Sequence, residues 1–270
     1  MSCECDMKRA VDTVRVLAAD GVQKANSGHP GMPMGCADYA FVLWSKFLRF
    51  DPADPQWVGR DRFVLSAGHG SMLLYSLLHL FGYELTLEDL AQFRQWGSRT
   101  PGHPEFGHTK GVEVTTGPLS SGLASGVGMA IGIKQLAARM GNSELFDQRV
   151  FVISGDGCMM EGTSHEACAI AGHQKLDNLI LFYDDNAITI EGATSIAFSE
   201  DVGQRFAAYG WHVIRINGQD VGQIGRALTE ALATKGKPVI IIGNAAIAYG
   251  APHLHGSAEA HGAPLGAEEL

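Results

Sequence analysis

The chain has 270 residues, 46% hydrophobic and 18% charged, which is ordinary for a globular protein able to bury a full α/β core. Its net charge of −9 and the lack of a basic block argue against binding to nucleic acid. The longest apolar stretch, 117–133, is laced with Gly and Ser and falls short of a membrane span. No secretory signal opens the chain and the five cysteines show no zinc-finger spacing, so we expect a cytoplasmic, single-domain protein.

The first half of the chain is predicted to be mainly helical. Apolar residues recur at helical spacing after residue 6, and Thr86 with Asp89 has the spacing of a helix N-cap followed by an acid. Residues 98–118 form a long Gly/Pro/His stretch with little periodicity, which is typical of a functional loop. The expected elements are helices over 6–26, 33–50 and 71–81, a strand over 62–66, and a glycine-rich helix beginning near Leu119 whose small residues indicate close backbone packing.

The second half alternates strands with helices. This alternation predicts a mainly parallel sheet covered on both faces, a three-layer α/β/α fold. Asp220 is a suitable N-cap for the last helix. The expected strands are 149–154, 178–184, 212–216 and 238–242, and the expected helices are 161–172, 201–209 and 220–235.

Two short motifs follow the first two of these strands. Gly-Asp-Gly occupies 155–157 and Asn-Ala-Ile occupies 186–188. Neighbouring parallel strands bring such loops together at their carboxyl ends, where open α/β sheets bind ligands. Mg²⁺ prefers hard oxygen ligands and shares them with phosphates, so the Asp156 carboxylate, the Asn186 amide and the Ile188 carbonyl predict a metal–diphosphate site. We expect Gly155 and Gly157 to let the backbone turn sharply beside a phosphate, although Gly-Asp-Gly alone is also a common turn.

The chain has eleven histidines, and four of them lie next to glycines in predicted loops: His29, His69, His103 and His261. Imidazoles can donate to phosphate or carbonyl oxygens and can move protons near neutral pH. A lone histidine in a loop is more often simply solvated, but four invite a joint explanation. A zinc hydrolase is the competing hypothesis, and the absence of His-Glu-x-x-His or another compact ligand spacing argues against it.

Seven stretches, taken together and in order, make the chain resemble the amino-terminal third of a transketolase. The resemblance runs from about residue 10 to residue 266. The stretches are Ser-Gly-His-Pro-Gly at 27–31, Ser-Ala-Gly-His-Gly at 66–70, Pro-Gly-His-Pro-Glu at 101–105, Thr-Gly-Pro-Leu at 116–119, Gly-Asp-Gly-Cys-Met-Met-Glu at 155–161, Tyr-Asp-Asp-Asn-Ala-Ile-Thr-Ile at 183–190 and His-Gly-Ala-Pro-Leu at 261–265.

The resemblance implies a function for these residues. Residues 1–270 would form one diphosphate-binding domain that holds thiamine diphosphate and Mg²⁺ (or Ca²⁺). The enzyme to which the domain belongs would transfer a two-carbon ketol unit from a ketose phosphate to an aldose phosphate in the pentose phosphate pathway. His69 and His261 would contact the diphosphate or the reacting centre, and His29 and His103 would hold the donor's hydroxyls and handle protons. The residues that would cover the aminopyrimidine are Gly117, Pro118 and Leu119, and those at the diphosphate would be Gly155, Asp156, Gly157 and Asn186. Glu161 would join an acidic relay, although an acid in the first turn of a helix also simply favours the helix dipole.

The chain also departs from the family pattern. The usual Gly-Gln-Gly after Thr-Gly-Pro-Leu is Ser120-Ser121-Gly122, and a usual histidine is replaced by Ala258. The pyrimidine and C-terminal domains lie outside these residues, so the resemblance implies an amino-terminal subunit or fragment that needs a partner chain, in a homodimer or heterotetramer. Two alternatives stay open: another thiamine diphosphate enzyme, of the deoxyxylulose-phosphate synthase or dihydroxyacetone synthase type, or a non-catalytic cofactor-binding or regulatory subunit.

Overall fold

A parallel sheet forms the middle layer of the molecule, as the alternating elements predicted. In the computed structural model, which describes residues 3–141 and 144–270, five strands pair in the order β1-β2-β3-β7-β6, and every pairing is parallel. The strands are β1 (Arg62–Leu65), β2 (Val150–Gly155), β3 (Leu179–Asp185), β6 (His212–Asn217) and β7 (Val239–Asn244).

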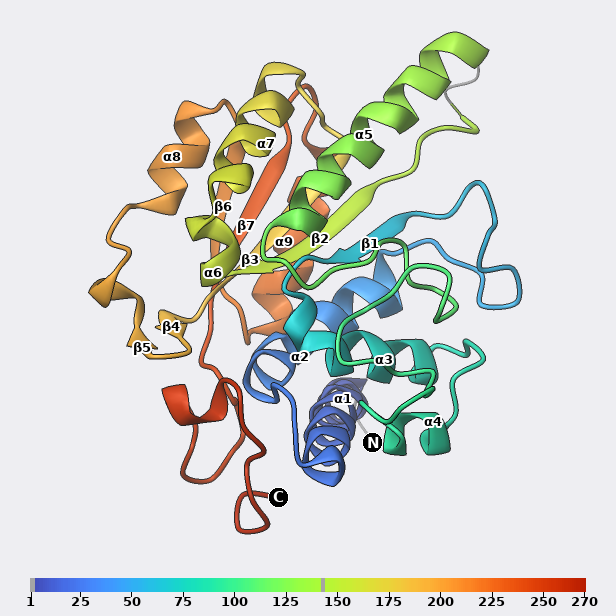
Figure 1. Cartoon of the computed structure of the whole chain (residues 1–270). Helices are drawn as coiled ribbons and strands as arrows, with labels where there is room; N and C mark the ends of the chain where they lie inside the picture. The colour runs from blue at the N-terminus through green and yellow to red at the C-terminus, as the bar shows by residue number, and fades with distance from the viewer. Residues whose placement is uncertain (1–2, 142–143) are drawn as a thin grey trace.

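Helices cover both faces of the sheet and complete the three-layer α/β/α fold (Figure 1). Among the described residues, none of them combines the length and the apolar character needed to cross a bilayer. One face carries α2 (Gly31–Lys46) and α9 (Val221–Ala233), with α1 (Cys3–Ala25), α3 (Ser71–Leu80) and the short α4 (Leu87–Ala91) packed outside them, and the other face carries α5 (Ser121–Met140), α7 (Gly162–His173) and α8 (Val202–Ala208).

The core lies on both sides of the three central strands. Apolar side chains of β2, β3 and β7 are buried almost without exception, because helices cover both faces of a parallel sheet. The rings of Tyr39 and Phe182 stack with centroids 3.8 Å apart and fasten α2 to β3. In α1 the predicted apolar stripe is confirmed, since Val11, Val14 and Val22 are all buried.

The predicted elements are confirmed within a few residues, and two short elements were missed. Thr86 and Asp89 form a capping box, and the Asp220 side chain caps α9 by accepting from the backbone amide of Gln223. The helix predicted over 161–172 is confirmed as α7 (Gly162–His173), but the sequence did not reveal the single turn α6 (Asp156–Met160) before it, which the extended backbone of Glu161 separates from α7. The sequence also did not reveal a small hairpin, β4 (Ile188–Thr189) and β5 (Gly192–Ala193).

The glycine-rich helix α5 packs closely only along part of its length. An added Cβ would lie 2.7 Å from the Ser66 Cα at Gly122 and 2.7 Å from a Val152 methyl at Gly126, so these glycines allow contact with the residue that follows β1 and with β2. At Gly128 and Gly132 no described atom lies within 4 Å of such a Cβ. Packing within the chain therefore explains the first two glycines and leaves the other two facing open space.

Replacing Gly172 with Ala should destabilise this fold. The added Cβ would lie 1.8 Å from the Tyr209 carbonyl oxygen, so α7 and the end of α8 must move apart. We expect the free energy of unfolding in urea to fall by about 2 kcal/mol, as for other overpacked sites. Gly225→Ala is the matched control in α9, where a Cβ meets no described atom within 4 Å. There helix propensity should raise the stability by about 0.8 kcal/mol, and equal effects of the two changes would contradict the packing.

Candidate functional site

The pairing of β2 with β3 brings the two motifs together. Ser154 pairs with Tyr183 and Gly155 with Asp184, so the loops that follow leave the sheet at the same carboxyl edge. A cavity of about 450 Å³ opens there. Its lining includes Asp184 and also nearly all the site residues that the sequence predicted: His29, His69, His103, Gly117, Leu119, Gly155, Asp156, Gly157, Glu161, Asn186, Ile188 and His261.

Asp156 begins helix α6 on the floor of this cavity and is only 4% exposed. The Tyr183 hydroxyl donates a 2.7 Å hydrogen bond to its Oδ1, whereas its buried Oδ2 has no partner among the described atoms. Burial raises the pKa of Asp156 to about 6, which the hydrogen bonds from Tyr183 and the Asn186 backbone offset only in part. One carboxylate oxygen is thus fixed and the other is free to bind a ligand.

Asn186 is held by its neighbours in the same loop. Its Nδ2 donates a 2.7 Å hydrogen bond to Asp184 Oδ2, and its Oδ1 accepts a 3.0 Å bond from the backbone amide of Ile188. Asp184 is fully buried, its Oδ1 has no partner among the described atoms, and burial followed by the charge of Asp156 raises its pKa to about 7. The amide orientation therefore leaves the second lone pair of the Asn186 oxygen available.

These oxygens fit a hard cation better than a soft one. Among the described residues there is no group of three or more His, Cys, Asp or Glu side chains that could enclose a metal. A cation here must complete its shell with the Asn186 amide, a backbone carbonyl and oxygens of a bound phosphate, which is how Mg²⁺ is usually held. A cation would also offset the unfavourable burial of Asp156 and Asp184.

The surroundings of Gly155 and Gly157 differ from the sharp turn that the sequence predicted for both. Gly155 is extended, with φ −109° and ψ −176°, so no sharp turn requires glycine there. A Cβ at Gly155 would meet no described atom within 4 Å, and the space above it is open to a ligand. At Gly157 a Cβ would lie 2.9 Å from a Leu119 methyl, so glycine allows the α6 turn and the 116–119 segment to approach closely.

Three of the predicted histidines form a compact cluster at the cavity. The ring centroids of His29, His69 and His261 are between 5.0 and 5.7 Å apart. The buried Nδ1 atoms of His29 and His261 have no partner among the described atoms. Burial lowers the pKa of His29 to about 4 and that of His69 to about 3, and it lowers the pKa of His261 as well. The cluster is therefore neutral at pH 7 and can both donate and accept hydrogen bonds.

The remaining predicted residues lie along the walls of the cavity, apart from Pro118. A Cβ at Gly117 would lie 3.6 Å from the His103 ring, so glycine keeps this wall open beside the imidazole. Pro118 is not among the lining residues, and its carbonyl accepts a hydrogen bond from Ser121. Glu161 is exposed at the rim, and no hydrogen bond from its side chain caps α7. Both its predicted role and the dipole alternative remain predictions.

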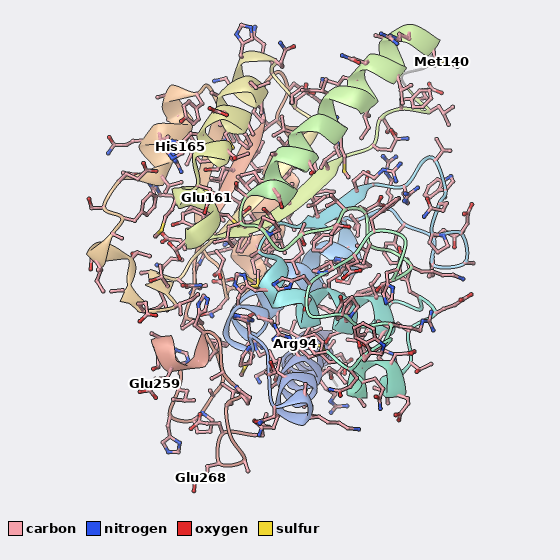
Figure 2. All side chains as sticks on the ribbon, in the orientation of Figure 1. Arg94, Met140, Glu161, His165, Glu259 and Glu268 are labelled. Carbon is pink, nitrogen blue, oxygen red and sulfur yellow. The ribbon has the colours of Figure 1, made fainter. Side chains whose placement is uncertain are left out.

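Sequence reasoning missed several residues that shape this site. Tyr183 and Asp184 lie within a quoted motif, and only the strand register shows which partner each one contacts. Arg94 comes from a segment without a motif, yet its positive charge contributes to the lowered pKa of His29 and of His103, after burial. Figure 2 shows Arg94 on the side of α1 and α3 and Glu161 at the junction of α6 and α7.

Comparison with known proteins identifies relatives over nearly the whole chain. A sequence model of the family described as the thiamine diphosphate-binding domain of transketolase matches residues 6–270. The transketolase of Geobacillus stearothermophilus is 54% identical over 263 residues, which are 96% of this chain and 39% of that protein. Transketolase 1 of Escherichia coli (strain K12) is 54% identical over 266 residues, covering 97% of this chain and 40% of that protein.

Solved structures agree with the sequence relatives. Transketolase from Leishmania mexicana superposes with a TM-score of 0.95 at 49% identity, over 97% of this chain and 40% of that chain. Transketolase from Campylobacter jejuni superposes with a TM-score of 0.95 at 50% identity, over 98% and 41% respectively. The chain thus has the fold of the first part of these proteins and spans about 40% of their length.

Part of the stability of the protein should be lost between pH 7 and pH 5 because of His69. Its pKa of about 3 in the folded chain lies below the ordinary 6.5, so the unfolded chain binds more protons over this window and folding becomes less favourable as the pH falls. At pH 5 this difference is worth up to about 2 kcal/mol. We expect His69→Gln to lose less stability than the wild-type chain, measured by urea unfolding at each pH. His173→Gln, at the exposed end of α7, should behave like the wild-type chain, and equal losses in all three would show that His69 is not held neutral.

Proposed function

Because the chain belongs to the transketolase family, through its thiamine diphosphate-binding domain, we propose that it anchors this cofactor in an enzyme that transfers a two-carbon ketol unit. The donor would be a ketose phosphate and the acceptor an aldose phosphate. Residues 1–270 would act as one diphosphate-binding domain, with the pyrimidine domain supplied by a partner chain or by further sequence. The proposal applies to that assembly, since the relatives are about 2.5 times longer than the region matched, as their 40% coverage implies.

One observation carries the proposal: Asp156 and Asn186 face the same cavity as three clustered neutral histidines. A metal–diphosphate floor beneath a histidine wall suits a phosphorylated cofactor whose reactive end is exposed to a sugar. Gly155 and Gly157 would allow the diphosphate to approach, and Asp156, Asn186 and the Ile188 carbonyl would hold Mg²⁺ or Ca²⁺. When bound, thiamine diphosphate supplies the nucleophilic carbon that attacks the ketose carbonyl.

The histidines would orient the sugar and move its protons. His29 and His69 have lowered pKa values of about 4 and 3, so at pH 7 each is a neutral group that can accept a hydrogen bond from a donor hydroxyl or donate one to an oxygen. We assign His29 and His103 to the donor's hydroxyls, and His69 and His261 to the diphosphate side. Gly117 and Leu119, with Pro118 between them, would cover the aminopyrimidine, and Glu161 at the rim would face the acidic relay.

The open face of α5 supports an association between copies of the chain. Gly128 and Gly132 have no described neighbour that an added Cβ would meet, and Leu136 and Met140 farther along the helix are exposed. Figure 2 shows Met140 at the end of α5, where the helix extends beyond the sheet. We propose that this face takes part in a homodimer or in a heterotetramer with a pyrimidine-domain chain.

A non-catalytic, cofactor-binding subunit is the second candidate, and one observation favours it. Ser120, in place of the usual glycine, has φ 63° and lies in the left-handed region, and its buried hydroxyl has no partner among the described atoms. This strain lies beside Leu119 in the cavity wall, where a transketolase has glycine. A subunit that only binds the cofactor would tolerate a displaced cavity wall at Leu119. An enzyme would need its partner to restore the position of that wall.

Removing the Asp156 carboxylate should abolish metal binding. In the assembled holoenzyme with saturating thiamine diphosphate, we expect Asp156→Ala to weaken Mg²⁺ binding by more than about 100-fold, beyond what changes outside the metal's own ligands cost. Calorimetric titration with Mg²⁺ measures the affinity. Asp185→Ala is the matched control, because Asp185 follows Asp184 in the same strand but does not line the cavity. An unchanged affinity in Asp156→Ala would refute the metal assignment.

The catalytic proposal is tested by recovering the partner. The tagged chain, purified from its own cells, should bring down a pyrimidine-domain chain in equal amount, identified by mass spectrometry, unless that domain is part of a longer form of the same chain. The assembly should then convert a ketose phosphate and an aldose phosphate in a coupled assay, and Asp156→Ala should remove this activity. An assembly that binds thiamine diphosphate without turnover would instead support the non-catalytic candidate.

A further inference from the structure

Helix α6 is too short to hold its own position. It consists of one turn, Asp156–Met160, and an isolated turn of this length is unstable in water. Its first residue, Asp156, is the metal ligand in the proposed function, and the backbone is extended at Glu161, directly after its last residue. The carbonyls at its C-terminal end therefore need partners from elsewhere in the fold.

Arg205, on α8, supplies one of those partners. Its Nη2 donates a 3.1 Å hydrogen bond to the Met159 carbonyl oxygen, and its side chain is only 10% exposed. A positive charge at the C-terminal end of a helix is also favourable to the helix dipole. Ser164 donates a longer, 3.3 Å bond to the same oxygen from within α7. Arg205 is thus the contact that ties the metal-binding turn to a separate helix.

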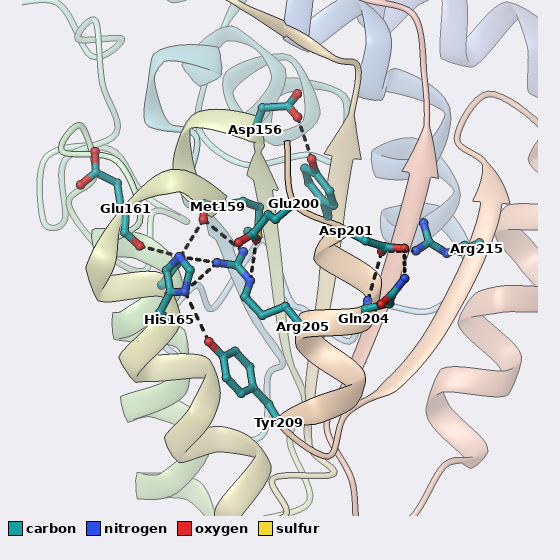
Figure 3. Close-up of polar contacts among 12 residues, drawn as sticks. Asp156, Met159, Glu161, His165, Glu200, Asp201, Gln204, Arg205, Tyr209 and Arg215 are labelled. Carbon is teal, nitrogen blue, oxygen red and sulfur yellow. Dashed lines mark hydrogen bonds and ion pairs between the residues drawn. The ribbon is translucent and has the colours of Figure 1, made fainter. Parts of the chain in front are cut away.

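The rest of the Arg205 side chain is fixed by two further groups (Figure 3). Its Nη1 contacts both ring nitrogens of His165 on α7, with 2.9 Å to Nδ1, and its Nε lies 2.9 Å from Glu200 Oε1. A guanidinium only donates, so a ring nitrogen of His165 accepts from it. The Tyr209 hydroxyl lies 3.4 Å from the same Nδ1. Only one of these neighbours, Glu200, is a carboxylate, so an ion pair alone does not explain why the charge is buried here.

The two ends of the α6 turn are therefore held by two different elements of the fold. Tyr183, on β3, fixes the Asp156 carboxylate, and Arg205, on α8, fixes the Met159 carbonyl. We propose that Arg205 is a positioning residue for the metal: by pinning the end of α6, it sets the direction in which Asp156 presents its free oxygen. This inference rests on the proposed metal–diphosphate function and adds to it a residue outside the cavity, since Arg205 is not among the lining residues.

The test is Mg²⁺ affinity in the assembled holoenzyme with saturating thiamine diphosphate, measured by calorimetry alongside the thermal midpoint. Arg205→Met keeps the length of the side chain and removes its donors. We expect its Kd for Mg²⁺ to rise about 10-fold at a temperature where the variant is fully folded, as for other groups that orient metal ligands. Arg205→Lys keeps the charge but lacks the planar fork, so it should fall between wild type and Arg205→Met. If Arg205→Met does not fold, Arg205→Lys carries the test alone, with an expected rise of several-fold.

Two controls separate positioning from general stability. Glu200→Gln removes the ion pair with Arg205 but leaves the hydrogen bond to Met159 in place. Arg215→Met removes an exposed arginine of β6 that pairs with Asp201, the residue that caps α8. Both should leave the Kd for Mg²⁺ within about twofold of wild type, a shift of less than about 0.5 kcal/mol. Folded Arg205 variants with lowered thermal midpoints and unchanged Kd would overturn the inference and leave the proposed function standing. A wild-type holoenzyme that binds no Mg²⁺ would overturn both.

Discussion

The cavity depends on the parallel register between β2 and β3. Pairing Gly155 with Asp184 places two oxygen-bearing loops at one edge of the sheet and brings the Tyr183 hydroxyl within 2.7 Å of Asp156 Oδ1. A shift of one residue would turn the side chains of β3 to the opposite faces, so Phe182 would lose its stack on Tyr39. The apolar core that fixes this register therefore also fixes the chemistry at its end.

The cavity collects groups that a folded protein normally avoids burying. Two carboxylates with raised pKa values, Asp156 and Asp184, lie on the floor, and three neutral imidazoles line the same cavity. Each of these groups is less favourable inside than in water, and the central strands around them supply the stability that makes the arrangement possible. A bound cation would offset the buried carboxylates, and a bound phosphate could accept hydrogen bonds from the imidazoles.

The sequence predicted those elements whose structure depends on local contacts and on their own apolar pattern. Continuous apolar runs predicted the strands, and the capping pattern at Thr86 predicted α4 because the contacts involved are local. The single turn α6 was missed, because it is stabilised by Arg205 from a later helix and not by its own sequence. The motifs located the cavity correctly, while its supporting contacts, such as Tyr183 to Asp156, depend on which strands are neighbours. Long-range contacts of this kind leave no periodic pattern in a single sequence.

The order of the strands also governs how the chain reaches this fold. Arg62 of β1 pairs with Val150 of β2, although two helices, a long irregular segment and α5 separate them in the chain. During synthesis α2 emerges well before β3, the strand it packs against, so this region depends on slow, non-local contacts. The cavity wall at His69 is made early and the wall at His261 last of all. A ligand can therefore recognise the complete site only when nearly the whole chain, from His29 to His261, has folded.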